Sequence, residues 1–196
     1  MPNTANKIKY GLKNVYYAVA TIAADGSATY DTPVAFPGAV SLSMDPQGEN
    51  TPFYADDIVY WVGASNTGYE GDLEIAKVID AFKTDVLGYQ TDNKGVLVEN
   101  ANANAVHFAL LFQFEGDVKA TRHVLYNCTA TRPSASGSTK EESVEPETES
   151  VTITATTVYN ASYDTDIVKA ETNESTDTTT YTGWFEAVYT PTRPTP

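Results

Sequence analysis

The sequence predicts a mainly β protein, an antiparallel β-sandwich or barrel with one flanking α-helix. Tyrosine, with 13 copies in 196 residues, and threonine are abundant, and both residue types favour strands. Residues 106–131 alternate apolar and less apolar side chains around Glu115-Gly116-Asp117, which predicts a long hairpin with one apolar face. Only residues 72–87 place apolar side chains at helical spacing over a long stretch, at Ile75, Ile79, Phe82 and Val86.

Shorter strands are expected where β-forming residues run or alternate between turn residues, at 15–22, 28–36, 40–44, 58–62, 151–156 and 181–189. Residues 45–57 contain two prolines and a glycine, so we expect a long loop there. Acidic loops are expected at 132–150 and 164–177. The expected domain organisation is a flexible N-terminal arm at 1–13, a β domain at 14–190 and an extended C-terminal tail at 191–196.

The formal net charge of −14 argues against nucleic-acid binding, which needs clustered lysine and arginine. Neither a signal peptide nor an apolar run of membrane-spanning length is recognisable, so we expect synthesis in the cytosol and no membrane partner. The single cysteine, Cys128, lies in an alternating stretch and is expected to be a buried, inert thiol.

Residues suited to chemistry are few. His107 and His123 fall on the two arms of the predicted hairpin, on its less apolar face, and strand parity places Cys128 on the face opposite His123. Asp56-Asp57 would point to opposite sides of a strand, and Asp164-Thr165-Asp166 lacks the remaining ligands of a calcium loop. We therefore predict a protein that is not an enzyme, with no catalytic, cofactor-binding or metal site.

Several stretches, taken in their order along the chain, resemble the major tail proteins of long-tailed, siphovirus-like phages that infect Gram-positive bacteria. The matching stretches are Thr67-Gly68-Tyr69-Glu70-Gly71-Asp72-Leu73-Glu74-Ile75-Ala76, Leu87-Gly88-Tyr89, Phe108-Ala109-Leu110, Arg122-His123-Val124-Leu125-Tyr126-Asn127-Cys128, Arg132-Pro133-Ser134 and Thr139-Lys140-Glu141. The resemblance covers most of residues 10–160, and the order and spacing of the stretches carry it.

This resemblance implies a structural virion protein that forms hexameric rings, which stack into a tail tube and let DNA pass to the host. The implied partners are further copies of the chain, other phage tail proteins, and DNA as passing cargo without tight binding. The implied fold is a β-sandwich or barrel with a flanking helix. From the exposed aromatic and turn residues of the 45–57 loop we expect an inter-subunit contact by Pro46, Gly48, Pro52, Phe53 and Tyr54. The pattern does not identify the acidic residues that face the lumen.

Three alternatives stay open at the level of sequence. The first is a carbohydrate-binding β-sandwich that stacks sugars on Tyr16, Tyr17, Tyr54, Tyr60, Trp61 and Trp184. The second is a hydrolase that uses His107 or His123, and the third is another virion protein, such as a capsid decoration or tail-terminator protein. Rings or filaments in electron micrographs distinguish a tube protein from the first two, which predict sugar binding or substrate turnover.

Overall fold

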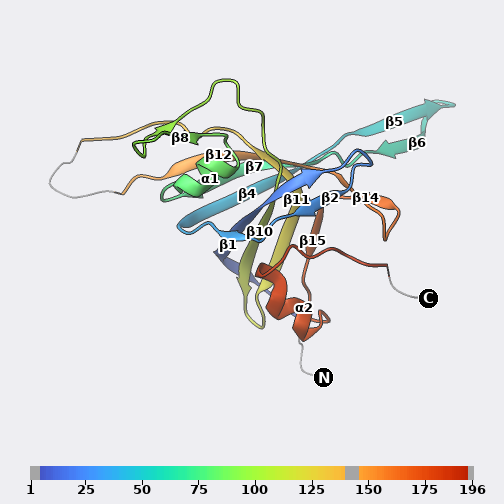
Figure 1. Ribbon diagram of the computed structural model, residues 1–196. Helices are drawn as coiled ribbons and strands as arrows, with labels where there is room; N and C mark the ends of the chain where they lie inside the picture. The colour runs from blue at the N-terminus through green and yellow to red at the C-terminus, as the bar shows by residue number, and fades with distance from the viewer. Residues whose placement is uncertain (1–4, 140–145, 194–196) are drawn as a thin grey trace.

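The computed structural model describes residues 5–139 and 146–193. Its main feature is a nine-stranded antiparallel sheet with the order β2-β1-β10-β11-β12-β7-β4, in which β3 also pairs with β1 and β15 with β11 (Figure 1). The elements are β1 Lys9–Ile22, β2 Ala28–Tyr30, β3 Val34–Ala35, β4 Ala39–Gln47, β5 Asn50–Ala55, β6 Ile58–Ala64, β7 Gly68–Ile75, α1 Asp80–Asp85, β8 Gln90–Thr91, β9 Leu97–Val98, β10 Phe108–Gly116, β11 Thr121–Ala130, β12 Glu149–Thr156, β13 Val158–Asn160, β14 Thr165–Ile167, β15 Lys169–Glu171, α2 Thr178–Thr182 and η1 Gly183–Phe185.

The hairpin of β10 and β11 lies at the centre of this sheet, and its prediction from the sequence is confirmed. Strand β1 pairs with β10, and β12 pairs with β11. The side chains of residues 108–113 are all buried, which means that both faces of β10 are covered. Phe108 and Leu110 belong to one hydrophobic cluster, whereas Ala109 and Leu111 belong to a second. The sequence pattern therefore identified one core face where the fold has two.

The first cluster is the interior of a sandwich. Leu73 on β7 and Ile153 on β12 pack in the same cluster as Tyr17 on β1 and Phe108 on β10, so the β12-β7-β4 part of the sheet covers the β1-β10-β11 part. Strands β1 and β4 share no ladder within the described ranges 5–139 and 146–193. The sheet thus stays open as a sandwich, which confirms the predicted mainly β, antiparallel class and excludes the closed barrel.

The second cluster is covered by the segment after β15, where the sequence predicted a strand at 181–189. That prediction is wrong, because Asp177 accepts hydrogen bonds from the backbone N–H groups of Thr179 and Thr180 and begins the short helix α2. The following turn η1 places Trp184, which is 2% exposed, on the β10-β11 face. The predicted loop at 164–177 also contains two short strands, β14 and β15, which pair with β13 and β11.

The predicted helix at 72–87 is wrong in its first half. Residues 68–75 form β7, which is hydrogen-bonded to β12 on one side and β4 on the other, so two ladders override the local helical spacing. Helix α1 begins only at Asp80 and is preceded by Ile79, whereas Asp72 caps nothing and accepts from Thr152. The packing of Phe82 is as predicted: its ring is fully buried and stacks on Phe36 at 4.5 Å.

The predicted loop at 45–57 is also wrong, because these residues finish β4 and form β5. Pro46 pairs with Tyr69 and Pro52 with Val62. Proline is tolerated on an edge strand, where its missing N–H would point away from the sheet, and β4 is the last strand of the sheet order. Gly48 joins β4 to β5 with φ +152°, and a Cβ atom there would lie 2.0 Å from the carbonyl oxygen of Ser65. Only glycine fits this close crossing.

The expected chain ends need a further correction. Residues 9–13 of the predicted N-terminal arm belong to β1, and the Asn6 side chain accepts from the backbone N–H groups of Val118 and Lys119. Within 132–150, residues 132–139 and 146–148 have no regular structure and β12 begins at Glu149, whereas 140–145 lie outside the described residues. Of the predicted tail at 191–196, residues 191–193 are irregular and 194–196 lie outside the described residues. No helix among the described residues is long and apolar enough to cross a membrane.

Candidate functional site

The feature that departs most from the sandwich is a β-hairpin that extends beyond it. Strands β4 and β7 pair as far as Gln47 and Gly68, and past the crossing at Gly48 their continuations pair again as β5 and β6. Figure 1 shows this β5–β6 hairpin extending away from the body of the molecule. The hairpin is a sheet of two strands, and no other strand of the described part of the chain pairs with either of them. A hairpin of that kind is only marginally stable in water unless another surface packs on it.

The β5–β6 hairpin carries large apolar side chains that have no cover. Their exposed fractions run from 49% to 69%, for Phe53, Tyr54, Ile58, Val59, Tyr60, Trp61 and Val62. Monomeric soluble proteins rarely leave so many neighbouring apolar groups in water, and such patches mark interaction sites. Aromatic side chains are also enriched in protein–protein interfaces. The hairpin therefore has the composition of a binding element for another protein surface.

The tip of the hairpin is a tight two-residue turn. Ala55 pairs with Ile58, and between them Asp56 and Asp57 have φ values of 51° and 61°. Positive φ at both central residues defines a type I′ turn, whose twist matches that of the flanking strands, and aspartate tolerates this conformation better than most residues. Two carboxylates are thus held at the end of an apolar ribbon.

All five residues that the sequence nominated for an inter-subunit contact lie on this hairpin or at its base. Phe53 is 59% exposed opposite Trp61, and Tyr54 is 63% exposed. Pro46 and Gly48 are at the base, and Pro52 is in β5. The sequence predicted the strand at 58–62, which β6 confirms, but it predicted a loop in place of β5 and so missed the pairing of the two. The available signal was Asp56-Asp57, a turn that directly links two apolar runs.

A second candidate surface is the outward face of β7 and its neighbours. Glu70, Asp72 and Glu74 alternate along β7 with buried residues such as Leu73 and Ile75. Ser41 and Thr148 donate to the Glu74 carboxylate at 2.9 and 2.6 Å, and Thr152 donates to Asp72 at 2.7 Å. The hydrogen bonds from Thr148, which has the larger effect, and from Ser41 hold the pKa of Glu74 below its usual range. The face is consequently acidic and rich in hydroxyl groups.

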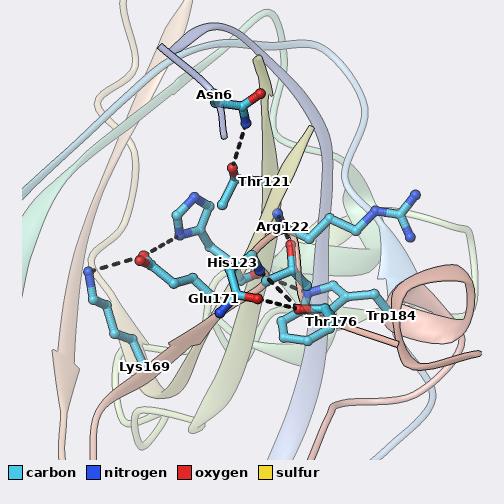
Figure 2. Close-up of polar contacts among 10 residues, drawn as sticks. Asn6, Thr121, Arg122, His123, Lys169, Glu171, Thr176 and Trp184 are labelled. Atoms are coloured by element: carbon cyan, nitrogen blue, oxygen red, sulfur yellow. Dashed lines mark hydrogen bonds and ion pairs between the residues drawn. The ribbon is translucent and has the colours of Figure 1, made fainter. Parts of the chain in front are cut away.

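The two histidines do not form a site together. His107 Nδ1 lies 2.7 Å from Asn127 Oδ1, whereas His123 Nδ1 lies 3.3 Å from Glu171 Oε2. Figure 2 shows the His123, Glu171 and Lys169 side chains converging. The parity argument about Cys128 and His123 is wrong: the register of β10 and β11 shifts between Phe108 and Leu110, and both side chains face the first cluster.

Burial shifts the pKa values of both Cys128 and His123. It raises the pKa of the fully buried Cys128 thiol to about 12, as an inert core cysteine requires. It lowers the pKa of His123 to about 4, so the imidazole is neutral at pH 7 although Glu171 is nearby. Among residues 5–139 and 146–193, no three His, Cys, Asp or Glu side chains are grouped to hold a metal ion.

Comparison with known proteins agrees with a structural role. No curated protein matches the chain. One family model, described as "Phage tail tube protein", matches residues 3–192 and thus includes the sandwich, the β5–β6 hairpin and the C-terminal segment. That family is structural and not a family of enzymes, and its members are parts of the virion tail. The chain belongs to the phage tail tube protein family.

Proposed function

We propose that this chain forms six-membered rings that stack into the tail tube of a long-tailed phage of Gram-positive bacteria, and that DNA passes through the tube to the host. One observation carries the proposal, namely the apolar β5–β6 hairpin that extends from the sandwich without cover. A protein whose family role is to build a tube needs a contact to its own copies, and this hairpin has the exposure and composition for one.

The hairpin favours a head-to-tail contact. An element that extends from one side of a subunit meets a different surface on the next subunit, which makes the interface heterologous. Heterologous contacts close into rings or continue as helical stacks, and both are needed for a tube of stacked rings. Pro46, Gly48, Pro52, Phe53 and Tyr54 are the proposed contact residues from the sequence, to which the structure adds the exposed strand Ile58–Val62.

The acidic face of β7 suits a lumen. Carboxylates at Glu70, Asp72 and Glu74 repel phosphate groups over roughly 8–10 Å at ordinary ionic strength. DNA that fills a narrow channel would be kept off the wall and would slide, whereas DNA outside the tube would feel little of this field. The hydroxyl groups of Thr148 and Ser41 that donate to Glu74 lower the pKa of its carboxyl group and so help to keep it ionised.

Other tail proteins are the proposed partners at the two ends of the tube. The first and last rings of a head-to-tail stack expose surfaces that every internal ring buries, and a different protein must cover them. Synthesis in the host cytoplasm precedes this assembly. The chain reaches the virion through these contacts, not through a membrane.

The deciding experiment is negative-stain electron microscopy of the purified chain over a series of concentrations. Rings or tubes that appear as the concentration rises support the proposal. Discrete particles of monomer size at every concentration, together with binding on a glycan array, would favour a carbohydrate-binding module. Of the residues named for sugar stacking, Tyr17 and Trp184 are 0% and 2% exposed and are part of the core, whereas Tyr54, Tyr60 and Trp61 are exposed.

A further inference from the structure

A cleft of about 380 Å³ opens between the two layers of the sandwich. The apolar part of its wall comes from both layers, since Leu42 and Met44 on β4 face Phe112, Phe114 and Leu125 on β10 and β11. Polar and charged residues complete the lining, among them Ser43, Tyr69 and His123. Leu42, Met44 and Phe114 are only partly buried, so the core is not sealed at this point. An unsealed core edge gains free energy when apolar side chains from elsewhere enter it.

The rim of this cleft is basic, which is unusual in a chain with a net charge of −14. Lys9 Nζ lies 4.5 Å from the centre of the Phe114 ring, and Lys169 Nζ lies 5.2 Å from the centre of the Tyr69 ring. Glu171 is the single carboxylate among the cleft residues, and it lies 3.7 Å from Lys169 (Figure 2). With two lysines and one glutamate, the rim attracts an acidic group.

The tip of the β5–β6 hairpin is complementary to this cleft in both respects. Asp56 and Asp57 are at its end, and the nearest large apolar side chains, Tyr54 and Ile58, have exposed fractions of 63% and 61%. An apolar ribbon with two carboxylates at its end matches a cleft that has an apolar wall and two lysines at its edge. The cleft has room for a few side chains and not for a whole ribbon, so only the tip would enter.

We propose that the tip of the β5–β6 hairpin of one subunit inserts into the Lys9–Lys169 cleft of a second copy of this chain. This inference rests on the proposed self-assembly and names its acceptor surface. The hairpin does not occupy the cleft of its own chain, because its apolar side chains are exposed. Each subunit therefore carries one donor and one acceptor at separate places, which is the arrangement that head-to-tail assembly needs.

A charge exchange tests the pairing. The cleft variant Lys9→Glu/Lys169→Glu and the tip variant Asp56→Lys/Asp57→Lys each place like charges in contact, so each alone should raise the critical concentration for assembly roughly tenfold or more. An equimolar mixture should recover assembly, because each reversed tip then meets a reversed cleft and each native tip a native cleft. Sedimentation and negative-stain images measure both results.

Matched controls keep the result specific. The double variant Asp31→Lys/Asp166→Lys makes the same change in net charge at exposed carboxylates outside the hairpin and the cleft, and it should assemble normally. Because lysine suits positive φ less well than aspartate, Asp56→Asn/Asp57→Gly removes the tip charges while it keeps a favoured type I′ turn. It should weaken assembly and reduce its sensitivity to salt.

The outcomes separate this inference from the proposed function. If the charge variants assemble like the native chain, or if the mixture shows no recovery while the Asn-Gly variant behaves normally, the cleft is not the acceptor. Ring formation by the native chain would still support a tube. Absence of rings and tubes for the native chain at every concentration would instead contradict both.

Discussion

The indole of Trp61 lies over Gly63, two residues further along the same strand of the β5–β6 hairpin. A Cβ atom on Gly63 would be 2.6 Å from Cη2 of that indole, closer than real Cβ contacts come. The glycine therefore lets the largest side chain of the hairpin lie flat along the ribbon while 62% of its surface stays exposed.

Substitution Gly63→Ala should lift the indole from the ribbon. Acrylamide reaches Trp61 and not the buried Trp184, so fluorescence quenching should increase, and assembly should weaken because the contact surface changes shape. Gly137→Ala is the control, since nothing lies within 4 Å of its added Cβ. Unchanged quenching in the Gly63 variant would show that the indole takes another position in solution.

Removal of the hairpin should separate folding from assembly. Deletion of residues 49–65 leaves Gly48-Asn66 between Gln47 and Thr67, which already share a backbone hydrogen bond of 3.0 Å, and Gly-Asn suits a two-residue turn. The free energy of unfolding should stay within about 1 kcal/mol of the native value, because the removed side chains are exposed. Chemical denaturation and electron microscopy provide the two measurements. Tubes formed by the shortened chain would rule the hairpin out as the contact.

Replacement of Phe82 by alanine should cost about 3–5 kcal/mol, because the ring is fully buried among aromatic neighbours. It stacks on Phe36 at 4.5 Å and meets Tyr17 edge-on at 5.1 Å, so the cavity cannot collapse easily. Urea titration measures the loss. Lys77→Ala, at an exposed position just before α1, is the control and should change stability little.

Stability should fall as the pH drops from about 6.5 to about 4, because burial lowers the pKa of His123 in the folded chain to about 4. As the pH falls, the unfolded chain binds a proton at His123 before the folded chain does. The stability that the neutral imidazole gives the folded chain is therefore present above pH 6.5 and is lost towards pH 4, by up to about 3 kcal/mol. The hydrogen-bonded carboxylates of Asp25, Glu74 and Asp177 have lowered pKa values, so their effect on stability appears at lower pH than that of His123. His123→Phe should flatten the slope between pH 6.5 and 4.5. An equal slope in both proteins would assign the effect to another group.

Neither subunits nor tubes should bind duplex DNA measurably at physiological salt, because the chain has a net charge of −14 and tight binding needs several basic contacts. Asp45 and Glu70 are opposite each other on β4 and β7. Their joint replacement by lysine should give the assembled tube a salt-sensitive affinity for DNA if this face lines the lumen. A mobility-shift titration in low salt compares the two proteins, and tight binding by the native chain would refute a passive conduit.

The elements that the sequence predicted well are those whose pattern is set by local alternation. Strand β10 is easily recognised because every second side chain, from Phe108 to Phe114, packs in the same cluster. Residues 72–87 were misassigned because Ile75 ends a strand and Ile79 precedes a helix, yet their spacing from Phe82 imitates one helical face. Only the pairing of β7 with two distant strands decides between the two structures.

The same limit applies to the candidate site. Turn and aromatic residues were enough to nominate Pro46, Gly48, Pro52, Phe53 and Tyr54. The prolines indicated a loop, because an edge strand that tolerates proline can be recognised only when the order of strands in the sheet is known. The cleft at Lys9 and Lys169 was not foreseen, since it brings together residues 160 positions apart in the chain. The shift that places Cys128 on the same face as His123 is likewise a property of the register and not of the alternation.

The cover of the second cluster sets an order of events during synthesis. Ala109, Leu111 and Tyr126 leave the ribosome well before Trp184 and Tyr189, the residues that close over them. The nascent chain thus presents a bare apolar face until residues 184–189 can fold back onto it. A chain that lacks residues 184–189 leaves that face uncovered, and exposed apolar surface of this kind promotes aggregation.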